Sequence, residues 1–232
     1  MADQLQALVA DCHARGMYVV IDVVCNHMGT LLTSTAPGYP AYNYPTGYPL
    51  SWRDTNNKYP GFFSDPSKFH NYGDVSNWSG AEQVLGAIFG LNDIKTEDAS
   101  VQAELVHAYT QLIADTDCDG YRVDTVKHVD GAFWDAWCPG IHQWAAVQGK
   151  GDFLMFGEVF DGDAVAGPFT GTMGSASYRF DSMLWYGMYW TTNNVWGGNA
   201  APQDIVNTYT SRSVFDPTVQ DRLVTFLDNH DN

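Results

Sequence analysis

The chain has 232 residues, of which 45% are hydrophobic and 16% charged, a composition typical of a globular protein and not of a disordered one. Its formal net charge is −16, from 27 acidic and 11 basic residues, which disfavours a nucleic acid as partner because phosphate backbones are repelled. No apolar run approaches the ~20 residues needed to span a bilayer, so we expect neither nucleic-acid binding nor membrane insertion.

The first part of the chain predicts a helix and then a buried strand. Apolar residues recur at helical spacing within residues 3–15, and Gly16 is a natural helix end. Residues 17–27 are β-branched and almost wholly apolar, as expected of a parallel strand that is covered on both faces. The polar residues of this strand gather at its C-terminal end.

Residues 28–92 interrupt this pattern. They are rich in Gly, Pro, Tyr, Asn and Ser and show no sustained period. A structureless loop of this length inside a compact domain would be unusual, so we predict a small inserted subdomain with short strands. Its aromatic rings could stack on sugars or pack within loops, and composition does not distinguish the two.

The remaining chain alternates helices and strands. We expect helices over residues 98–116, through Phe133, Trp137 and Trp144, and over 204–209, and strands over 119–126, 153–159, part of 177–190, and 223–231. Such alternation indicates an α/β fold with parallel strands. Polar residues collect at the C-terminal strand ends, which is where a β/α barrel builds its active site.

Three acidic residues at separate strand ends form a candidate catalytic set: Asp124, Glu158 and Asp231. A single strand-end carboxylate is more often a cap than a catalyst, but a barrel would direct all three into one cup. Cleavage of a glycosidic bond with retention needs a carboxylate nucleophile and a carboxylic acid about 5–5.5 Å apart. The third carboxylate could stabilise the positively charged transition state.

The neighbours of two carboxylates suit these roles. Arg122 lies two positions before Asp124, hence on the same strand face, and a guanidinium there would lower the pKa of that carboxylate. Glu158 lies between Phe156 and Phe160, and apolar surroundings raise the pKa of a carboxyl, as a general acid requires.

Four segments resemble, in order and spacing, the short conserved stretches of the α-amylase family, glycoside hydrolase family 13. They are Asp22-Val23-Val24-Cys25-Asn26-His27, Gly120-Tyr121-Arg122-Val123-Asp124-Thr125-Val126-Lys127-His128, Gly157-Glu158-Val159 and Phe226-Leu227-Asp228-Asn229-His230-Asp231. Glu158-Val159-Phe160-Asp161-Gly162-Asp163 also looks like the secreted fungal-type α-amylases. The resemblance runs almost from end to end.

The resemblance implies a role for each matching residue. Asp124 corresponds to the nucleophile, Glu158 to the acid/base and Asp231 to the transition-state stabiliser. Substrate contacts are implied at His27, Arg122, Lys127, His128 and His230. A structural Ca²⁺ is implied as cofactor, held by Asn26, Asp93 and the backbone carbonyl of His128, with Glu82 a further candidate. The family usually has Pro where Asn92 stands.

The resemblance also implies a (β/α)8 TIM barrel of which this chain holds the third to seventh strands. The barrel parts are then residues 1–27 and 93–232, with 28–92 as the inserted subdomain. The chain opens within a helix and stops after Asp231-Asn232 without a turn, so we expect a fragment covering most of the barrel, with no signal peptide in it. The family implies endo-hydrolysis of α-1,4 bonds in starch or glycogen by an extracellular monomer.

Other readings stay open at this point. A transglycosylase, an α-glucosidase, or a sucrose- or trehalose-directed enzyme of the same family would share these motifs, and a truncated fragment could be inactive. A metal-dependent hydrolase would use His27, His128 and His230, although paired short-spaced His ligands are absent from the sequence. A non-catalytic relative would typically lack the carboxylates. Four cysteines show no C-x-x-C spacing, and a Cys118–Cys138 bridge is left open.

Overall fold

The centre of the fold is a four-stranded parallel sheet. The computed structural model describes residues 2–43, 47–171 and 179–231. The strand order is β1 (Val20–Val24), β4 (Gly120–Asp124), β5 (Leu154–Gly157) and β6 (Ser182–Met183). Val24 lies opposite Asp124, and Val123 lies opposite Gly157. The C-terminal ends of β1, β4 and β5 therefore lie at one edge of the sheet.

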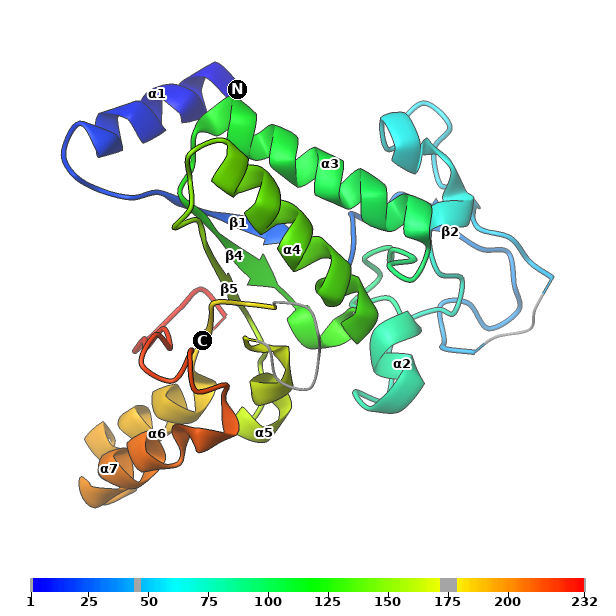
Figure 1. Cartoon of the computed structure of the whole chain (residues 1–232). Coiled ribbons are helices and arrows are strands. Elements are labelled where there is room, and N and C mark those ends of the chain that lie inside the picture. Colours follow the sequence, from blue (N-terminus) through cyan, green and yellow to red (C-terminus); the bar gives the residue numbers. More distant parts are fainter. Residues whose placement is uncertain (1, 44–46, 172–178, 232) are drawn as a thin grey trace.

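A helix occurs at each place where the sequence pattern predicts one, and further short helices occur elsewhere. They are α1 (Ala2–His13), α2 (Gly80–Leu85), α3 (Ala99–Thr116), α4 (Gly131–Val147), α5 (Asp163–Ala166), α6 (Tyr186–Trp196) and α7 (Gln203–Thr210), with 3₁₀ helices at Gly61–Ser64, Pro66–Lys68, Val126–His128, Gly167–Phe169 and Arg212–Val214. The predicted helices within α1, α3, α4 and α7 are confirmed. In Figure 1, α3 and α4 lie side by side over one face of the sheet.

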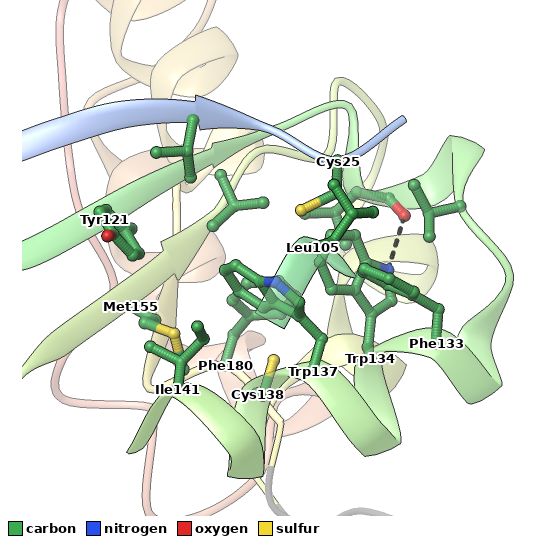
Figure 2. Packing of buried hydrophobic residues seen from close by; sticks show 14 of the residues in the cluster. Cys25, Leu105, Tyr121, Phe133, Trp134, Trp137, Cys138, Ile141, Met155 and Phe180 are labelled. Carbon is green, nitrogen blue, oxygen red and sulfur yellow. Dashed lines mark hydrogen bonds between the residues drawn. The ribbon is translucent and has the colours of Figure 1, made fainter. Parts of the chain in front are cut away.

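Aromatic residues of α4 fill the core under these helices. Trp134 and Trp137 are fully buried and meet at a ring separation of 5.6 Å, with Tyr121 of β4 and Met155 of β5 close by (Figure 2). The Trp134 indole donates to the carbonyl of Val126 at 3.1 Å, which satisfies its buried N–H. Replacing either Trp by Ala would cost about 3–5 kcal/mol. This core fixes β4 and β5, which carry the predicted catalytic residues.

The predicted insertion contains two short antiparallel strands, β2 (Leu32–Thr33) and β3 (Ser51–Trp52). Within the insertion, Asn92 joins distant segments: its buried Oδ1 accepts from the Leu32 amide at 2.9 Å and from the Tyr59 hydroxyl at 2.8 Å. Proline could not make these bonds, so the unusual Asn92 has a structural purpose. In Figure 1 the insertion projects beyond the N-terminal end of α3. Its boundaries as a subdomain stay a prediction.

The predicted seventh strand, residues 223–231, is wrong. Only Val224 pairs, in a single bridge with Leu184, and the chain turns before Asp231. The turn forms because side chains there bond to nearby backbone: Asp228 Oδ1 accepts from the Asn229 amide, and Asn229 Oδ1 accepts from the Asp231 amide at 3.0 Å. The central sheet thus has four parallel strands among the described residues. The sixth strand is β6, and Ser177 and Tyr178 of its predicted range lie outside the described residues.

Two remaining predictions concern cysteines and membranes. All four cysteines are free thiols, so the Cys118–Cys138 bridge is not formed, and Cys25 is fully buried. In the described part of the chain, no helix combines the length and apolarity needed to cross a membrane.

Candidate active site

Two predicted catalytic residues lie side by side at the C-terminal edge of the sheet. Asp124 is the last residue of β4, and Glu158 directly follows β5. The Glu158 amide donates to the Val123 carbonyl at 2.7 Å, and the Val126 amide donates to the Glu158 carbonyl at 3.0 Å. These bonds extend the pairing of the two strands by one residue and fix the backbone under both carboxyls.

A single guanidinium connects three carboxylates. Arg122 Nη1 lies 2.7 Å from Asp124 Oδ1 and 2.9 Å from Asp22 Oδ1, whereas Nη2 lies 2.7 Å from Glu158 Oε1. Burial alone would lower the pKa of Arg122, but the carboxylates, Glu158 foremost, raise it above its usual range. Arg122 therefore pairs with the predicted acid/base as well as with the predicted nucleophile, and Asp22 is a partner that the motif did not indicate.

The environment of Glu158 raises its pKa. The main cause is burial, and the Asp124 carboxyl, within hydrogen-bond reach, acts in the same direction. Arg122 and the hydroxyl of Tyr186 partly oppose this shift. The direction is the one expected from the apolar neighbours of Glu158, and it suits a residue that must donate a proton.

Tyr186 is a site residue that sequence reasoning missed. Its hydroxyl donates to Glu158 Oε1 at 2.9 Å and accepts from Asn229 Nδ2 at 3.2 Å. In the sequence, a tyrosine among aromatic and apolar residues is interpreted as a residue of the hydrophobic core. Its place three residues after β6, at the strand end that faces the site, is the signal that could have indicated a role.

Two predicted substrate-binding histidines lie near Asp124. Burial lowers the pKa of His27, with the Asp124 charge opposing, and burial also lowers the pKa of His128. His128 Nδ1 lies 3.0 Å from the carbonyl of Gln83, and its ring meets Trp78 edge-on at 5.7 Å. Both imidazoles are therefore neutral at pH 7 and can exchange hydrogen bonds with hydroxyl groups.

The ammonium group of Lys127 bonds to other groups of the protein. Its ammonium donates to the carbonyl of Phe160 at 2.9 Å and pairs with Asp161 at 3.0 Å. These bonds join the segment after β4 to the segment after β5. Lys127 thereby supports the loop that follows Glu158.

Asp231 and His230 lie at the rim. Their side chains are 48% and 70% exposed, and His230 Nε2 lies 3.3 Å from Asp231 Oδ2. The Asp231 charge reaches Tyr186, whose pKa is raised chiefly by burial and also by Glu158 and Asp231. The structure thus brings together Arg122, Asp124, Glu158, His27 and His128, and hydrogen bonds through Asn229 and Tyr186 connect the backbone of Asp231 to Glu158.

Two of the residues predicted to hold Ca²⁺, Asn26 and Asp93, meet just after β1. Asn26 and Asp93 are 1% and 2% exposed, and the Asn26 side chain hydrogen-bonds to the Asp93 carboxyl. Burial raises the pKa of Asp93 to about 7, and His70, 2.6 Å away, opposes the shift. No group of three or more His, Cys, Asp or Glu side chains suited to a metal occurs among the residues with described positions. A cation here would depend on amide and carbonyl oxygens besides Asp93, which fits a hard cation.

The Glu82 carboxylate is used elsewhere. It is exposed and accepts from the hydroxyl of Ser76 at 2.7 Å and from the amide of Asn77 at 2.8 Å. It therefore closes a turn before α2, and the structure does not support it as a cation ligand.

A cavity of about 1130 Å³ lies at the opposite end of the strands. It is lined by Tyr18, Val20, His142, Lys150 and Phe153, among others, and contains none of the predicted site residues. At the end that carries Asp124 and Glu158, the side chains are joined by the ion pairs of Arg122. Size alone therefore does not locate the chemistry of this chain.

Comparison with known proteins identifies the family. The model of the α-amylase catalytic domain matches residues 1–232. The chain belongs to the α-amylase family. Among curated members, an α-amylase from Streptomyces lividans is 33% identical over 214 residues, covering 78% of this chain and 23% of that protein. α-Amylase 1 from Lipomyces kononenkoae is 30% identical over 241 residues, covering 100% of this chain and 32% of that protein.

Solved structures of the family agree in fold. The Anoxybacillus α-amylase superposes with a TM-score of 0.74 at 29% identity, over 99% of this chain and 43% of that one. The Geobacillus thermoleovorans α-amylase complexed with acarbose gives 0.73 at 26% identity, over 99% and 44%. A cyclomaltodextrin glucanotransferase from Klebsiella oxytoca is 29% identical over 70% of this chain. The chain thus spans less than half the length of these relatives.

Proposed function

We propose that this α-amylase-family chain carries the catalytic residues of a retaining glycoside hydrolase that cleaves internal α-1,4 bonds of starch- or glycogen-type glucans. The observation that carries the proposal is the pairing of Asp124 and Glu158 on adjacent strand ends by Arg122. Asp124 forms a close ion pair with the guanidinium, whereas the pKa of Glu158 is raised by burial. Retaining glycosidases need this division of labour between two carboxyls.

The proposed reaction has two steps. Asp124 attacks the anomeric carbon while Glu158 protonates the leaving oxygen, which gives a covalent glycosyl-enzyme. Glu158 then removes a proton from water, and the hydroxide displaces Asp124, so the anomeric configuration is retained. Asp231 stabilises the positive charge that develops on the sugar. Because Asp124 and Glu158 are in hydrogen-bond reach of each other, the sugar must enter between them to give the spacing of about 5–5.5 Å.

The neighbouring residues are proposed to hold the substrate and the fold. His27, His128 and His230 exchange hydrogen bonds with sugar hydroxyls, Arg122 orients the carboxyls, and Lys127 contacts substrate only if it leaves Asp161. Asn26, Asp93 and the carbonyl of His128 would hold a structural Ca²⁺, which supplies charge neutralisation at the junction of β1 and the insertion. We further propose an extracellular monomer, since the −16 charge favours solubility.

A transglycosylase is the second candidate. Cyclomaltodextrin glucanotransferases are among the relatives, at 29% identity over 70% of this chain. Such an enzyme forms the same covalent intermediate but passes the sugar to another sugar hydroxyl instead of water. Linear malto-oligosaccharides as products support the hydrolase, and cyclic products from the same starch digest support the transglycosylase.

The proposal is tested with Glu158→Gln, which preserves shape but removes the transferable proton. We expect release of reducing sugar from soluble starch to fall about a hundredfold or more, with unchanged thermal unfolding. Glu104→Gln on α3, distant from the site, is the matched control and should keep full activity. Near-normal starch hydrolysis by Glu158→Gln would refute the assignment of the acid/base.

A further inference from the structure

Tyr186 lies where the sheet meets the C-terminal helices. It is the first residue of α6, three positions after β6, and is 1% exposed. The amide of the preceding Trp185 donates to the carbonyl of Val224 at 2.9 Å, and the Tyr186 amide donates to the carbonyl of Leu184 at 3.1 Å. The backbone of Tyr186 is therefore fixed on both sides before its side chain makes any contact.

The ring of Tyr186 is held by other rings. It meets Phe160 edge-on at 4.9 Å, Phe226 edge-on at 5.1 Å and Trp190 at 5.5 Å. These contacts come from the loop after β5, from α6 itself and from the C-terminal segment. Because a tyrosine has only two side-chain torsions, such packing fixes the position of its hydroxyl.

The hydroxyl of Tyr186 has a defined direction of donation. The Asn229 amide donates to it at 3.2 Å, so the hydroxyl hydrogen is free to point at Glu158 Oε1, 2.9 Å away. Arg122 Nη2 lies 2.7 Å from the same Oε1 in an ion pair, whereas Oε2 accepts from the Thr125 amide at the longer distance of 3.5 Å. The hydroxyl and the guanidinium both favour negative charge on Oε1, so the proton of a protonated Glu158 resides on Oε2.

Asn229 also bonds to the segment that carries the third carboxylate. Its Oδ1 accepts from the Asp231 amide at 3.0 Å while its Nδ2 donates to Tyr186. A continuous series of hydrogen bonds thus runs from Glu158 through Tyr186 and Asn229 to the backbone of Asp231. No bond of Asp231 to Asp124 or Glu158 is found in the described part of the chain.

We propose that Tyr186 is a positioning residue: its hydroxyl fixes the Glu158 carboxyl, leaves Oε2 as the oxygen that carries the transferred proton, and joins Glu158 through Asn229 to the segment of Asp231. This inference rests on the proposed function of Glu158. A purely structural role would need only the ring of Tyr186, and phenylalanine would then replace it without loss.

The first test is Tyr186→Phe, which keeps the ring and its packing. We expect kcat on soluble starch to fall about tenfold, KM to change less than about twofold, and the unfolding temperature to stay near that of the wild type. The alkaline limb of the pH–rate profile should move to higher pH, because the lost hydrogen bond favours the charged carboxylate and lowers the pKa of Glu158. Arg122 and Asp124, which also face Glu158, are unchanged in this variant.

Two further variants control the result. Tyr189→Phe removes a hydroxyl from the same aromatic cluster, where the ring stacks on Phe226 at 4.8 Å, and should leave kcat and the pH profile unchanged. Asn229→Ala should reproduce part of the Tyr186→Phe effect, and the double variant should lose less than the two single variants combined, because both changes interrupt one series of bonds.

Titration of the Glu158 carboxyl by ¹³C NMR gives a readout that needs no activity. The chain has only four glutamates, Glu158 included, so the spectrum has few overlapping signals. A higher midpoint in Tyr186→Phe and Asn229→Ala than in the wild type supports the inference. An unchanged midpoint together with unchanged kcat overturns it, even where Glu158→Gln is inactive and the proposed function stands. If Glu158→Gln is fully active, the proposed function fails instead, whatever the titration shows.

Discussion

Arg122 determines the electrostatics of the site at the scale of single residues. Its planar guanidinium places separate N–H groups toward Asp22, Asp124 and Glu158, and its side chain is only 11% exposed. Three carboxyls this close would otherwise repel one another and take up protons. The arginine therefore offsets the repulsion among the three carboxyls, while burial still raises the pKa of Glu158.

We expect Arg122→Lys to be strongly impaired although it keeps the positive charge. A lysine ammonium is a compact point charge and cannot bond all three carboxyls in the geometry of the guanidinium. Loss of one charge-assisted bond costs about 2 kcal/mol, so kcat/KM on starch should fall about thirtyfold or more. Arg15→Lys, at an exposed position two residues after α1, is the control. Kinetics within twofold of the wild type would contradict this account of Arg122.

The sequence predicts those site residues that lie at the ends of strands. Asp124, Glu158 and Arg122 follow from the two-residue strand period and from the rule that parallel strands end at one edge. Tyr186 and Asn229 could not be found in this way, because a hydrogen bond between distant segments leaves no periodic trace. The engagement of Lys127 with Asp161 is invisible for the same reason.

At the scale of elements, α3 shows how a helix start is fixed on the surface. Asp98 is the N-cap, and its Oδ1 accepts from the Ser100 amide at 2.7 Å, while Lys68 lies 3.4 Å from its Oδ2. The Ser100 hydroxyl and amide lower the pKa of Asp98 to about 2. The charged cap satisfies a free N–H and suits the positive end of the helix dipole.

We expect Asp98→Ala to lower the unfolding temperature at pH 7 by about 2–4 °C, and Asp98→Asn to lower it less, since asparagine also caps helices. The folded-state pKa of about 2 lies below the unfolded value of about 3.9, so the folded state binds fewer protons. This contribution is complete above about pH 4 and is lost as the pH falls to about 2. Melting curves should show the difference between wild type and Asp98→Asn shrink in that window; a constant difference would contradict it.

Elements with a strong period were predictable and short elements were not. The helices α3 and α4 bury a stripe of large residues, and β4 and β5 are apolar runs between loops, so pattern alone located them. Residues 223–231 have the same apolar beginning, yet only Val224 pairs with a neighbouring strand. A segment forms a strand only when it hydrogen-bonds to a neighbouring strand, and the local sequence does not indicate whether that neighbour is in place.

At the scale of the whole molecule, the junction between sheet and insertion is the place where distant segments must stay together. The chain leaves β1 at Asn26 and returns from the insertion at Asp93, and the His27 and Asp93 backbones pair in a single bridge. The Ile94 amide donates to the Asn26 carbonyl at 2.8 Å. His27, which faces Asp124, lies in this junction, so its stability bears directly on the site.

We expect Ca²⁺ to stabilise this junction. A ligand that binds only the folded state adds about 2.7 kcal/mol at a hundred times its Kd, or about 5–11 °C in unfolding temperature for a chain of this size. Millimolar CaCl₂ should therefore raise the melting temperature of the metal-free protein, and EDTA should reverse the change. Mg²⁺ should act more weakly, because it demands a stricter octahedral geometry than amide and carbonyl oxygens at this junction would provide.

Variants separate binding at this junction from a general effect of salt. Asp93→Asn removes the charged ligand, so its melting temperature should no longer respond to Ca²⁺, whereas Asp11→Asn on the exposed face of α1 should respond like the wild type. Asp93 also pairs with His70, so Asp93→Asn is less stable even without the ion, and the quantity to compare is the calcium-induced shift and not the melting temperature itself. If the wild-type melting temperature is the same in CaCl₂ and in EDTA, the proposal that Ca²⁺ binds at this junction is wrong. Asn92 and the Asn26–Asp93 contact would then hold the insertion by hydrogen bonds alone.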